Sequence, residues 1–217
     1  MTKLLVIGDL HLHNKFSTYL KDQVNCIKRI IREYLPERVV FLGDIFERRH
    51  PSPTELLAFK DLLATCEEHV TWGIHILRGN HDSETKATDS KTALSVYTAP
   101  SSKIHVITQP LALHLQDVTL HFIPHYEDEK IIKRELKNVD RSSILFGHFG
   151  FRGCLNTAGD ADFNISPDAF PCDTILGHIH HFKRYTTDAS KDITVLGTPY
   201  SISYQENDKI CNVGIFD

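Results

Sequence analysis

Five short stretches of this chain each combine an apolar run with a glycine and a side chain that can bind a metal ion. In chain order they are VIGDLHLH, VVFLGDIF, HILRGNHD, SILFGHFG and TILGHIHH. Four begin with a β-branched or leucine-rich run of strand length, whereas HILRGNHD has a shorter run and an Arg before its glycine. A strand that ends at a sharp glycine turn delivers the next side chain to the edge of a sheet, where α/β folds bind ligands. The pattern predicts an α/β fold with a metal site at its strand ends.

The candidate ligands in these stretches are a mixed set of oxygen and nitrogen donors. They are Asp9, His11, Asp44, Asn80, His148, His178 and His180. Such a set suits two adjacent divalent ions, of which Mn is expected first and Fe or Zn are alternatives. Asp44 is the expected bridge because it stands alone in its stretch, after the longest apolar run. His81 follows Asn80, and adjacent side chains on an extended chain diverge, so His81 is expected to face the substrate.

Apolar periodicity predicts a β-α-β-α-β opening, which implies right-handed crossovers and a largely parallel sheet. The expected elements are a strand at 3–8, a helix at 17–34, a strand at 38–42, a helix from Ser52-Pro53-Thr54 to about Glu68, and a strand at 72–77. Later elements are strands at 104–107, 111–115 and 118–123, a helix at 129–138, and strands at 143–147, 174–176, 183–187, 193–196 and 210–216. Close strand spacing in this second half favours antiparallel pairing.

Composition and the N-terminus indicate a cytoplasmic protein without a membrane segment. No apolar run approaches the roughly 20 residues that span a bilayer. The apolar run before Asp9 is too short for a signal peptide. The five cysteines are odd in number, scattered and without a C-x-x-C pair, so reduced thiols are expected. The net charge of −4 does not indicate a polyanion binder, but it omits the charge of bound metal ions.

The five stretches closely resemble the signature of the calcineurin-like metallophosphoesterase superfamily, which runs D-x-H, G-D, G-N-H-[DE], G-H and G-H-x-H. The resemblance implies a four-layer α/β/β/α sandwich, here a single domain over residues 1–217, with two central mixed sheets and helices outside. It also implies phosphoester hydrolysis by hydroxide held between two metal ions, with His81 as the general acid. The implied ligands are Asp9, His11 and His180 for the first ion, Asn80, His148 and His178 for the second, and Asp44 for both.

Glu47 distinguishes branches of this superfamily. In its protein serine/threonine phosphatases the second stretch runs G-D-x-x-D-R-G, and the second Asp orients the catalytic His. Archaeal and eukaryotic double-strand-break repair nucleases usually carry a His there, whereas SbcD-type bacterial nucleases carry an acidic residue. GDIFERR is similar to the SbcD type, so Glu47 is expected to orient His81. The Pro-Ser-Pro helix start and VLGTPYSISYQENDK, similar to the G-S-P-x-x-x-S-x-x-E…K stretch of those nucleases, favour the same branch.

Three functions remain open. The first is an SbcD-like phosphodiesterase or nuclease acting on DNA, with an SbcC-type ATPase as a possible partner. The second is a phosphatase or phosphodiesterase for nucleotides or other small phosphoesters, favoured by the acidic charge and by the lack of the DNA-capping and ATPase-docking segments. The third is a non-catalytic scaffold, as in the retromer subunit, against which the intact ligand set and His81 argue. The sequence leans slightly to the nuclease.

Overall fold

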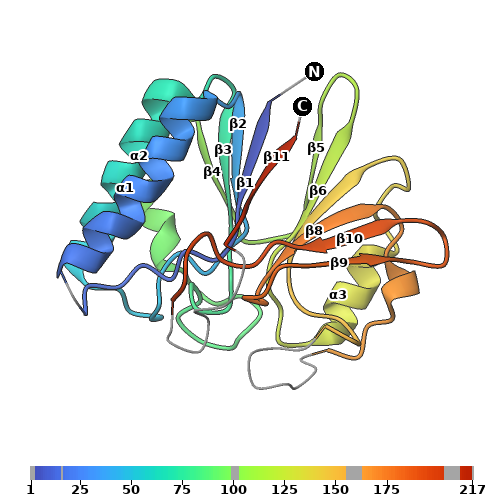
Figure 1. Ribbon diagram of the computed structural model, residues 1–217. Helices are drawn as coiled ribbons and strands as arrows, with labels where there is room; N and C mark the ends of the chain where they lie inside the picture. Colours follow the sequence, from blue (N-terminus) through green and yellow to red (C-terminus); the bar gives the residue numbers. More distant parts are fainter. Residues whose placement is uncertain (1–2, 16, 99–102, 155–162, 203–210, 217) are drawn as a thin grey trace.

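Two β-sheets pack face to face, and helices cover their outer faces (Figure 1). The computed structural model describes residues 3–15, 17–98, 103–154, 163–202 and 211–216. Helices α1 (Ser17–Tyr34) and α2 (Pro53–His69) lie against one sheet, and α3 (Glu129–Leu136) lies against the other. Two 3₁₀ turns that the sequence did not predict, η1 (Ala93–Tyr97) and η2 (Pro167–Ala169), complete the helical segments among the described residues. The predicted four-layer α/β/β/α sandwich is confirmed.

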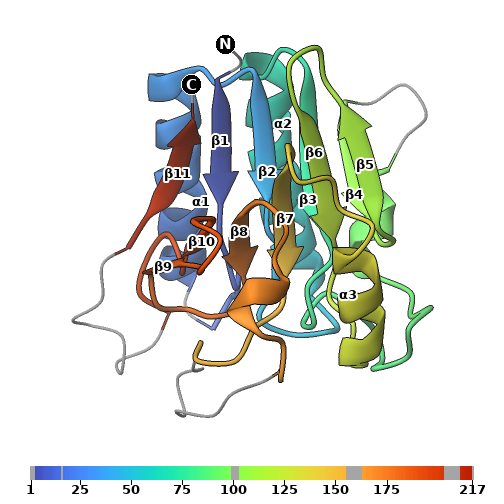
Figure 2. The ribbon, with the colours of Figure 1, turned by 90° about the vertical axis from the view of Figure 1, so that its right-hand side faces the viewer.

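The first sheet has the strand order β11-β1-β2-β3-β4. Its strands are β1 (Leu4–Ile7), β2 (Arg38–Phe41), β3 (Gly73–Leu77), β4 (Ile104–Ile107) and β11 (Val213–Phe216). Strands β1 to β4 are parallel, and β11 pairs antiparallel with β1. The carboxyl ends of β1, β2 and β3 therefore meet at one edge of the sheet, which is the lower edge in Figure 2.

The second sheet has the strand order β5-β6-β7-β8-β10-β9. Its strands are β5 (Leu111–His114), β6 (Thr119–Ile123), β7 (Ile144–His148), β8 (Asp173–Gly177), β9 (Lys183–Thr186) and β10 (Asp192–Val195). Only the edge pairs β5–β6 and β9–β10 are antiparallel, and the four central strands are parallel.

Both sheets are mixed, as predicted, but the antiparallel pairing that close strand spacing favoured in the second half is wrong for the centre of this sheet. It is also wrong for β4, which joins the first sheet parallel to β3. Short turns close only the two edge hairpins. Helix α3, the long segment between β7 and β8, and strand β9 provide the crossovers that parallel neighbours require.

Both faces of the central strands are buried because alternate side chains enter different cores. Leu5 packs beneath α1 and α2, whereas its neighbour Val6 lies between the two sheets. In β7, Phe146 also lies between the sheets, and Leu145 packs on the α3 side. Three stacked cores separate four layers, which explains why these strands are continuous apolar runs instead of alternating ones.

Helix α2 begins at the Ser52-Pro53-Thr54 start that the sequence predicted, and its first turn is closed by a capping box. Ser52 accepts a hydrogen bond from the backbone N–H of Glu55, and Glu55 Oε2 accepts one from the backbone N–H of Ser52 at 2.6 Å. Pro53 occupies the first turn, where its missing N–H costs nothing. Glu55 Oε1 also accepts from the backbone N–H of Asn14 at 2.9 Å, so the cap ties α2 to the segment that follows β1.

Several other expectations concern the chain as a whole. All five cysteines are free thiols, as expected. Among the described residues no helix is both long and apolar enough to cross a membrane. Residues 203–210, which include the second half of the nuclease-like stretch (203–209) and the start of the predicted last strand, lie outside the described residues.

Candidate dinuclear metal site

The predicted ligands come together where the carboxyl ends of the two sheets meet. Three groups of side chains place donor atoms within 4.8 Å of one another: Asp9, His11 and His180; His11, Asp44 and His81; and Asp44, His148 and His178. Asn80 joins the third group, because its Oδ1 lies 3.0 Å from His148 Nε2 and 2.9 Å from His178 Nδ1. Asp44 belongs to two of these groups, as a bridging carboxylate would.

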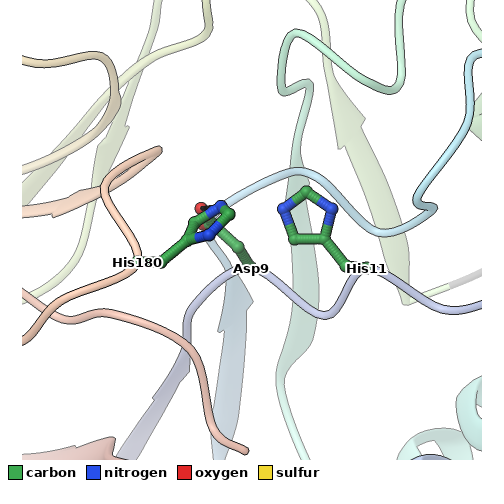
Figure 3. Close-up of side chains that lie close together, drawn as sticks. All are labelled: Asp9, His11 and His180. Atoms are coloured by element: carbon green, nitrogen blue, oxygen red, sulfur yellow. Dashed lines mark ion pairs between the residues drawn. The ribbon is translucent and has the colours of Figure 1, made fainter. Parts of the chain in front are cut away.

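The first group combines the segments that follow β1 and β8 (Figure 3). Asp9 is fully buried, and its Oδ2 lies 3.9 Å from His180 Nε2. The backbone N–H of His178 donates to the same carboxylate, at 2.9 Å to Oδ2 and 3.1 Å to Oδ1. The His11 ring stands edge-on to the His180 ring, with centroids 4.8 Å apart. Asp9 therefore connects the first sheet to the second at the site.

The third group, which contains His148, is held in place by a main-chain contact. His148 is fully buried, and its Nδ1 lies 2.7 Å from the carbonyl oxygen of Leu42. A carbonyl only accepts, so Nδ1 carries the proton, and Nε2 is left with a lone pair that can bind a metal ion at the site. That Nε2 lies 3.4 Å from Asp44 Oδ2. A ligating histidine is typically oriented by a hydrogen bond from its other ring nitrogen, as here.

The glycines are required mainly because backbone and ligands approach closely. A Cβ on Gly79 would lie 2.1 Å from Asp44 Oδ1, and one on Gly177 would lie 2.6 Å from Asp9 Oδ1. Of the glycines directly before a ligand, Gly43 alone has a positive φ, at +108°. Positive φ angles occur instead at some of the proposed ligands themselves, among them His11 at φ +44°. Such conformations in non-glycine residues are uncommon and cluster at functional sites.

The surroundings of the His11 ring show whether a metal ion fits this site. It is buried, and neither ring nitrogen makes a well-aligned hydrogen bond. Nδ1 lies 2.9 Å from Glu47 Oε2, and Nε2 lies 3.7 Å from Asp44 Oδ2. Buried polar atoms without partners are costly, so Nε2 requires a ligand. A cation at Nε2, with Nδ1–H towards Glu47, reproduces the carboxylate–histidine–metal arrangement of known sites. The donors present therefore fit divalent ions.

The charges of the site are those of a cation-binding centre. Burial opposes protonation of His148, but Asp44 and Asp9 overcome it and raise the pKa of His148 to about 9. Burial likewise opposes ionisation of Asp44, yet His148 and His11 hold the pKa of Asp44 well below its usual range. Two buried carboxylates thus draw positive charge into the site, which metal ions would supply in place of protons.

Glu47 contacts the site differently from the prediction. Its carboxylate lies against His11 Nδ1, whereas its backbone carbonyl lies 2.7 Å from His81 Nδ1. The expectation that the Glu47 side chain orients His81 is therefore wrong, because the main chain does so. Since the carbonyl accepts, His81 Nδ1 carries a proton and Nε2 is left to face a reacting group. The backbone N–H of His81 also donates to Asp44 Oδ1, at 2.8 Å.

Asp82 is a site residue that the sequence analysis did not single out. It is buried, and its Oδ2 accepts from the backbone N–H of Gly79 at 2.9 Å. Its Oδ1 accepts from the backbone N–H of Ile45 at 3.0 Å. Burial and the nearby Asp44 carboxylate raise the pKa of Asp82 to about 7. Asp82 therefore ties the loop that carries Asn80 to the loop that carries Asp44. The signal was available, since it is the acidic residue that ends the G-N-H-D stretch.

Replacing Asp82 with Asn should loosen both loops. The amide has one acceptor oxygen, and its NH₂ would meet a backbone N–H, leaving a buried donor without a partner. We expect a loss of roughly 1–3 kcal/mol in the free energy of unfolding. Urea denaturation of chelator-treated protein at pH 8 measures it, with Asp89→Asn, an exposed aspartate on the same loop, as the control. Equal stability of both variants would show that Asp82 does not tie the loops.

A family model for calcineurin-like phosphoesterases matches residues 2–182, which include all five ligand stretches. A dimetal phosphatase from Danio rerio is similar in structure, with a TM-score of 0.62, 12% identity, and coverage of 91% of this chain and 87% of that one. A hypothetical protein from Thermus thermophilus has a TM-score of 0.50, 13% identity and coverage of 94% and 79%. A nuclease from Pseudomonas putida, with a TM-score of 0.43, 15% identity and coverage of 88% and 71%, is too dissimilar to bear on function. No curated protein sequence matches significantly.

Proposed function

Because this chain belongs to the calcineurin-like phosphoesterase family, whose members are metal-dependent hydrolases, we propose that its clustered donors hold two divalent ions. One ion is held by Asp9, His11 and His180, the other by Asn80, His148 and His178, and Asp44 bridges both. The observation that carries this assignment is the position of Asp44, whose Oδ2 lies 3.7 Å from Nε2 of His11, a ligand of the first ion, and 3.4 Å from Nε2 of His148, a ligand of the second. Residues 1–217 are proposed to act as one catalytic domain.

The bound ions and the side chains around them have different roles in phosphoester hydrolysis. Two bound divalent ions supply a water of lowered pKa and neutralise charge on the phosphoryl oxygens. Glu47 and the Leu42 carbonyl fix the rings of His11 and His148, which keeps the donor nitrogens aimed at the site. His81, fixed through Nδ1 by the Glu47 carbonyl, offers a proton at Nε2 to the leaving oxygen.

For the substrate we propose phosphodiesters, with DNA as the first candidate. The acidic residue in GDIFERR, which resembles SbcD-type nucleases, has a definite place in this site, because its carboxylate faces the ligand His11. Arg49 and Lys86 line a pocket next to Asn80, where a polyanionic substrate would pass. An SbcC-type ATPase partner stays a prediction. The alternative substrate class, nucleotides or other small phosphoesters, requires the same metal site and differs only in what surrounds it.

Four substrates tested side by side with added Mn²⁺ separate these classes. They are single-stranded DNA, double-stranded DNA, bis(p-nitrophenyl) phosphate and p-nitrophenyl phosphate. A nuclease should cleave DNA and the diester and hydrolyse the monoester slowly. Faster hydrolysis of the monoester, with intact DNA, would favour the small-molecule phosphatase. No hydrolysis of any substrate at full metal occupancy would support the scaffold.

The metal preference should follow the ligand mixture. After removal of bound metal with EDTA, we expect Mn²⁺ to restore activity and Mg²⁺ to substitute poorly. Mg²⁺ prefers octahedral shells of oxygen ligands, whereas this site offers four imidazoles. Residual metal is measured by elemental analysis before each addition, so that a trace of Mn²⁺ cannot account for the rate. Equal activity with Mg²⁺ alone would contradict the proposed ligand set.

A further inference from the structure

Two stacked aromatic rings lie close to the metal site and have no role in the chemistry described above. His13 comes two residues after the ligand His11, and Tyr19 belongs to the first turn of α1. The centroids of the two rings are 4.9 Å apart, and their planes are inclined by 27°. Both side chains are half-buried. The pair therefore forms an aromatic surface that solvent can reach.

The short segment between His11 and His13 keeps this surface near the metals. Leu12 is fully buried and forms a parallel bridge with Phe46, and its carbonyl accepts from the backbone N–H of Glu47 at 3.2 Å. Because Leu12 points into the core, its neighbour His13 points out of it. The Glu47 carboxylate lies 2.9 Å from His11 Nδ1, and its pKa is lowered by His11 first and also by His13. One carboxylate thus interacts with both a proposed metal ligand and the His13 ring.

Hydrogen bonds hold both rings in place. The backbone N–H of Lys15 donates to His13 Nδ1 at 3.4 Å, and the Tyr19 hydroxyl donates to the Ser201 carbonyl at 2.6 Å. The contact to His13 lies at the edge of the ring and covers neither face. One face packs on Tyr19, and no other ring stacks on His13 within the described part of the chain. The opposite face is thus the one that another planar group can cover, and an ordered ring loses little entropy when it binds one.

The chemistry of this surface matches a nucleobase. Bases stack on aromatic rings, histidine included, through faces that every base has. A phosphoester without a base has no such planar group. Lys15, exposed on the same segment, adds the positive charge that accompanies stacking rings in sites for single strands. His13 belongs to none of the donor groups found among the described residues, so a role as a metal ligand does not explain it.

We propose that His13, supported by Tyr19, stacks on the nucleobase that adjoins the scissile phosphate. The proposal rests on the proposed phosphodiesterase function and names its substrate class: esters of nucleotides, as opposed to phosphodiesters without a base. His13 would contact the substrate away from the reacting atoms, so it would determine specificity. The base belongs either to a single-stranded nucleic acid or to a small nucleotide ester, and the ring recognises both in the same way.

Two diesters with the same leaving group test the stacking. They are thymidine 5′-(p-nitrophenyl phosphate) and methyl p-nitrophenyl phosphate, and the thymidine 3′ ester is measured as well because the base can adjoin either side of the phosphate. We expect kcat/KM to be about tenfold higher for the better thymidine ester than for the methyl ester, as one stacked base provides. His13→Ala should bring this ratio close to one, whereas His13→Phe, which keeps a ring without nitrogen, should preserve it.

His114→Ala is the control, because this exposed histidine ends β5, at the edge of the second sheet and away from the ligands. It should keep the ratio of the unmodified protein. A ratio near one in the unmodified protein, or an unchanged ratio in His13→Ala, would overturn the proposal. So would a loss of the ratio in His13→Phe as well as in His13→Ala, since that result assigns His13 a polar contact instead of stacking.

Binding without turnover separates this proposal from the proposed function. Calorimetry on Mn²⁺-loaded protein should show thymidine 5′-monophosphate binding more tightly than methyl phosphate, and His13→Ala should remove the difference. If this preference holds but no diester is hydrolysed, the stacking is supported and the phosphodiesterase function fails. If the diesters are hydrolysed without any dependence on His13, the stacking is overturned and the phosphodiesterase function stands.

An oligothymidylate distinguishes the two sources of the base. Cleavage of this single strand with the same dependence on His13 would support the proposal for nucleic acids. Dependence on His13 with the thymidine esters alone, and an intact oligothymidylate, would support it for small nucleotide esters.

Discussion

Asp44→Asn is expected to lose both metal ions together, and with them nearly all activity. Asp44 Oδ2 lies 3.7 Å from His11 Nε2 in one group of donors and 3.4 Å from His148 Nε2 in the other. Asn offers one neutral acceptor oxygen and cannot balance the charge of two cations. Loss of an outer-shell partner already costs roughly 10–100-fold in metal affinity, and loss of the shared ligand should exceed that.

Elemental analysis and turnover on bis(p-nitrophenyl) phosphate measure the two effects in the same samples. Asp117→Asn, an exposed aspartate in the turn between β5 and β6, makes the same chemical change away from the site and should keep both ions. The dinuclear assignment would be wrong if Asp44→Asn retained both ions and turned over at a near-native rate. Loss of one ion alone would assign Asp44 to a single metal.

His81→Ala should separate catalysis from metal binding. Because Nδ1 is held by the Glu47 carbonyl, Nε2 can deliver a proton to the leaving oxygen. Turnover on DNA, whose leaving alkoxide is strongly basic, should fall by roughly 10²–10⁴-fold, the usual worth of a general acid. The loss should be much smaller with p-nitrophenolate as the leaving group, since that anion needs little protonation. Metal content should not change.

The matched variant is Glu47→Gln, for which the structure reverses the expectation from sequence. Its carboxylate faces the ligand His11 and not His81, so the variant should weaken metal binding by roughly 10–100-fold and affect all leaving groups alike. Loss of metal in His81→Ala would identify His81 as a ligand, which its grouping with His11 and Asp44 permits geometrically. An equal loss of activity on good and poor leaving groups would also exclude the acid role.

The class of fold and the place of the site at the strand ends can both be predicted from the pattern of residues. Apolar runs of strand length place their last residues at the carboxyl edge of a sheet, and this relation is local. Asp9, Asp44 and His148 therefore follow from one-dimensional pattern alone. The Ser52–Glu55 capping box is equally local, because both of its hydrogen bonds join residues three apart.

Contacts between segments distant in sequence could not be predicted in this way, because they depend on how the two sheets pack. The tertiary structure assigned β4 to the first sheet, because crossover connections rather than strand spacing govern parallel pairing. In the folded chain the Glu47 carboxylate lies against His11, and Asp82 accepts hydrogen bonds from both ligand loops. Arg78 and His125, 47 residues apart, form one pocket wall in the same way. Each of these contacts depends on which backbone carbonyl or N–H lies opposite a side chain, and the packing of the two sheets determines that position.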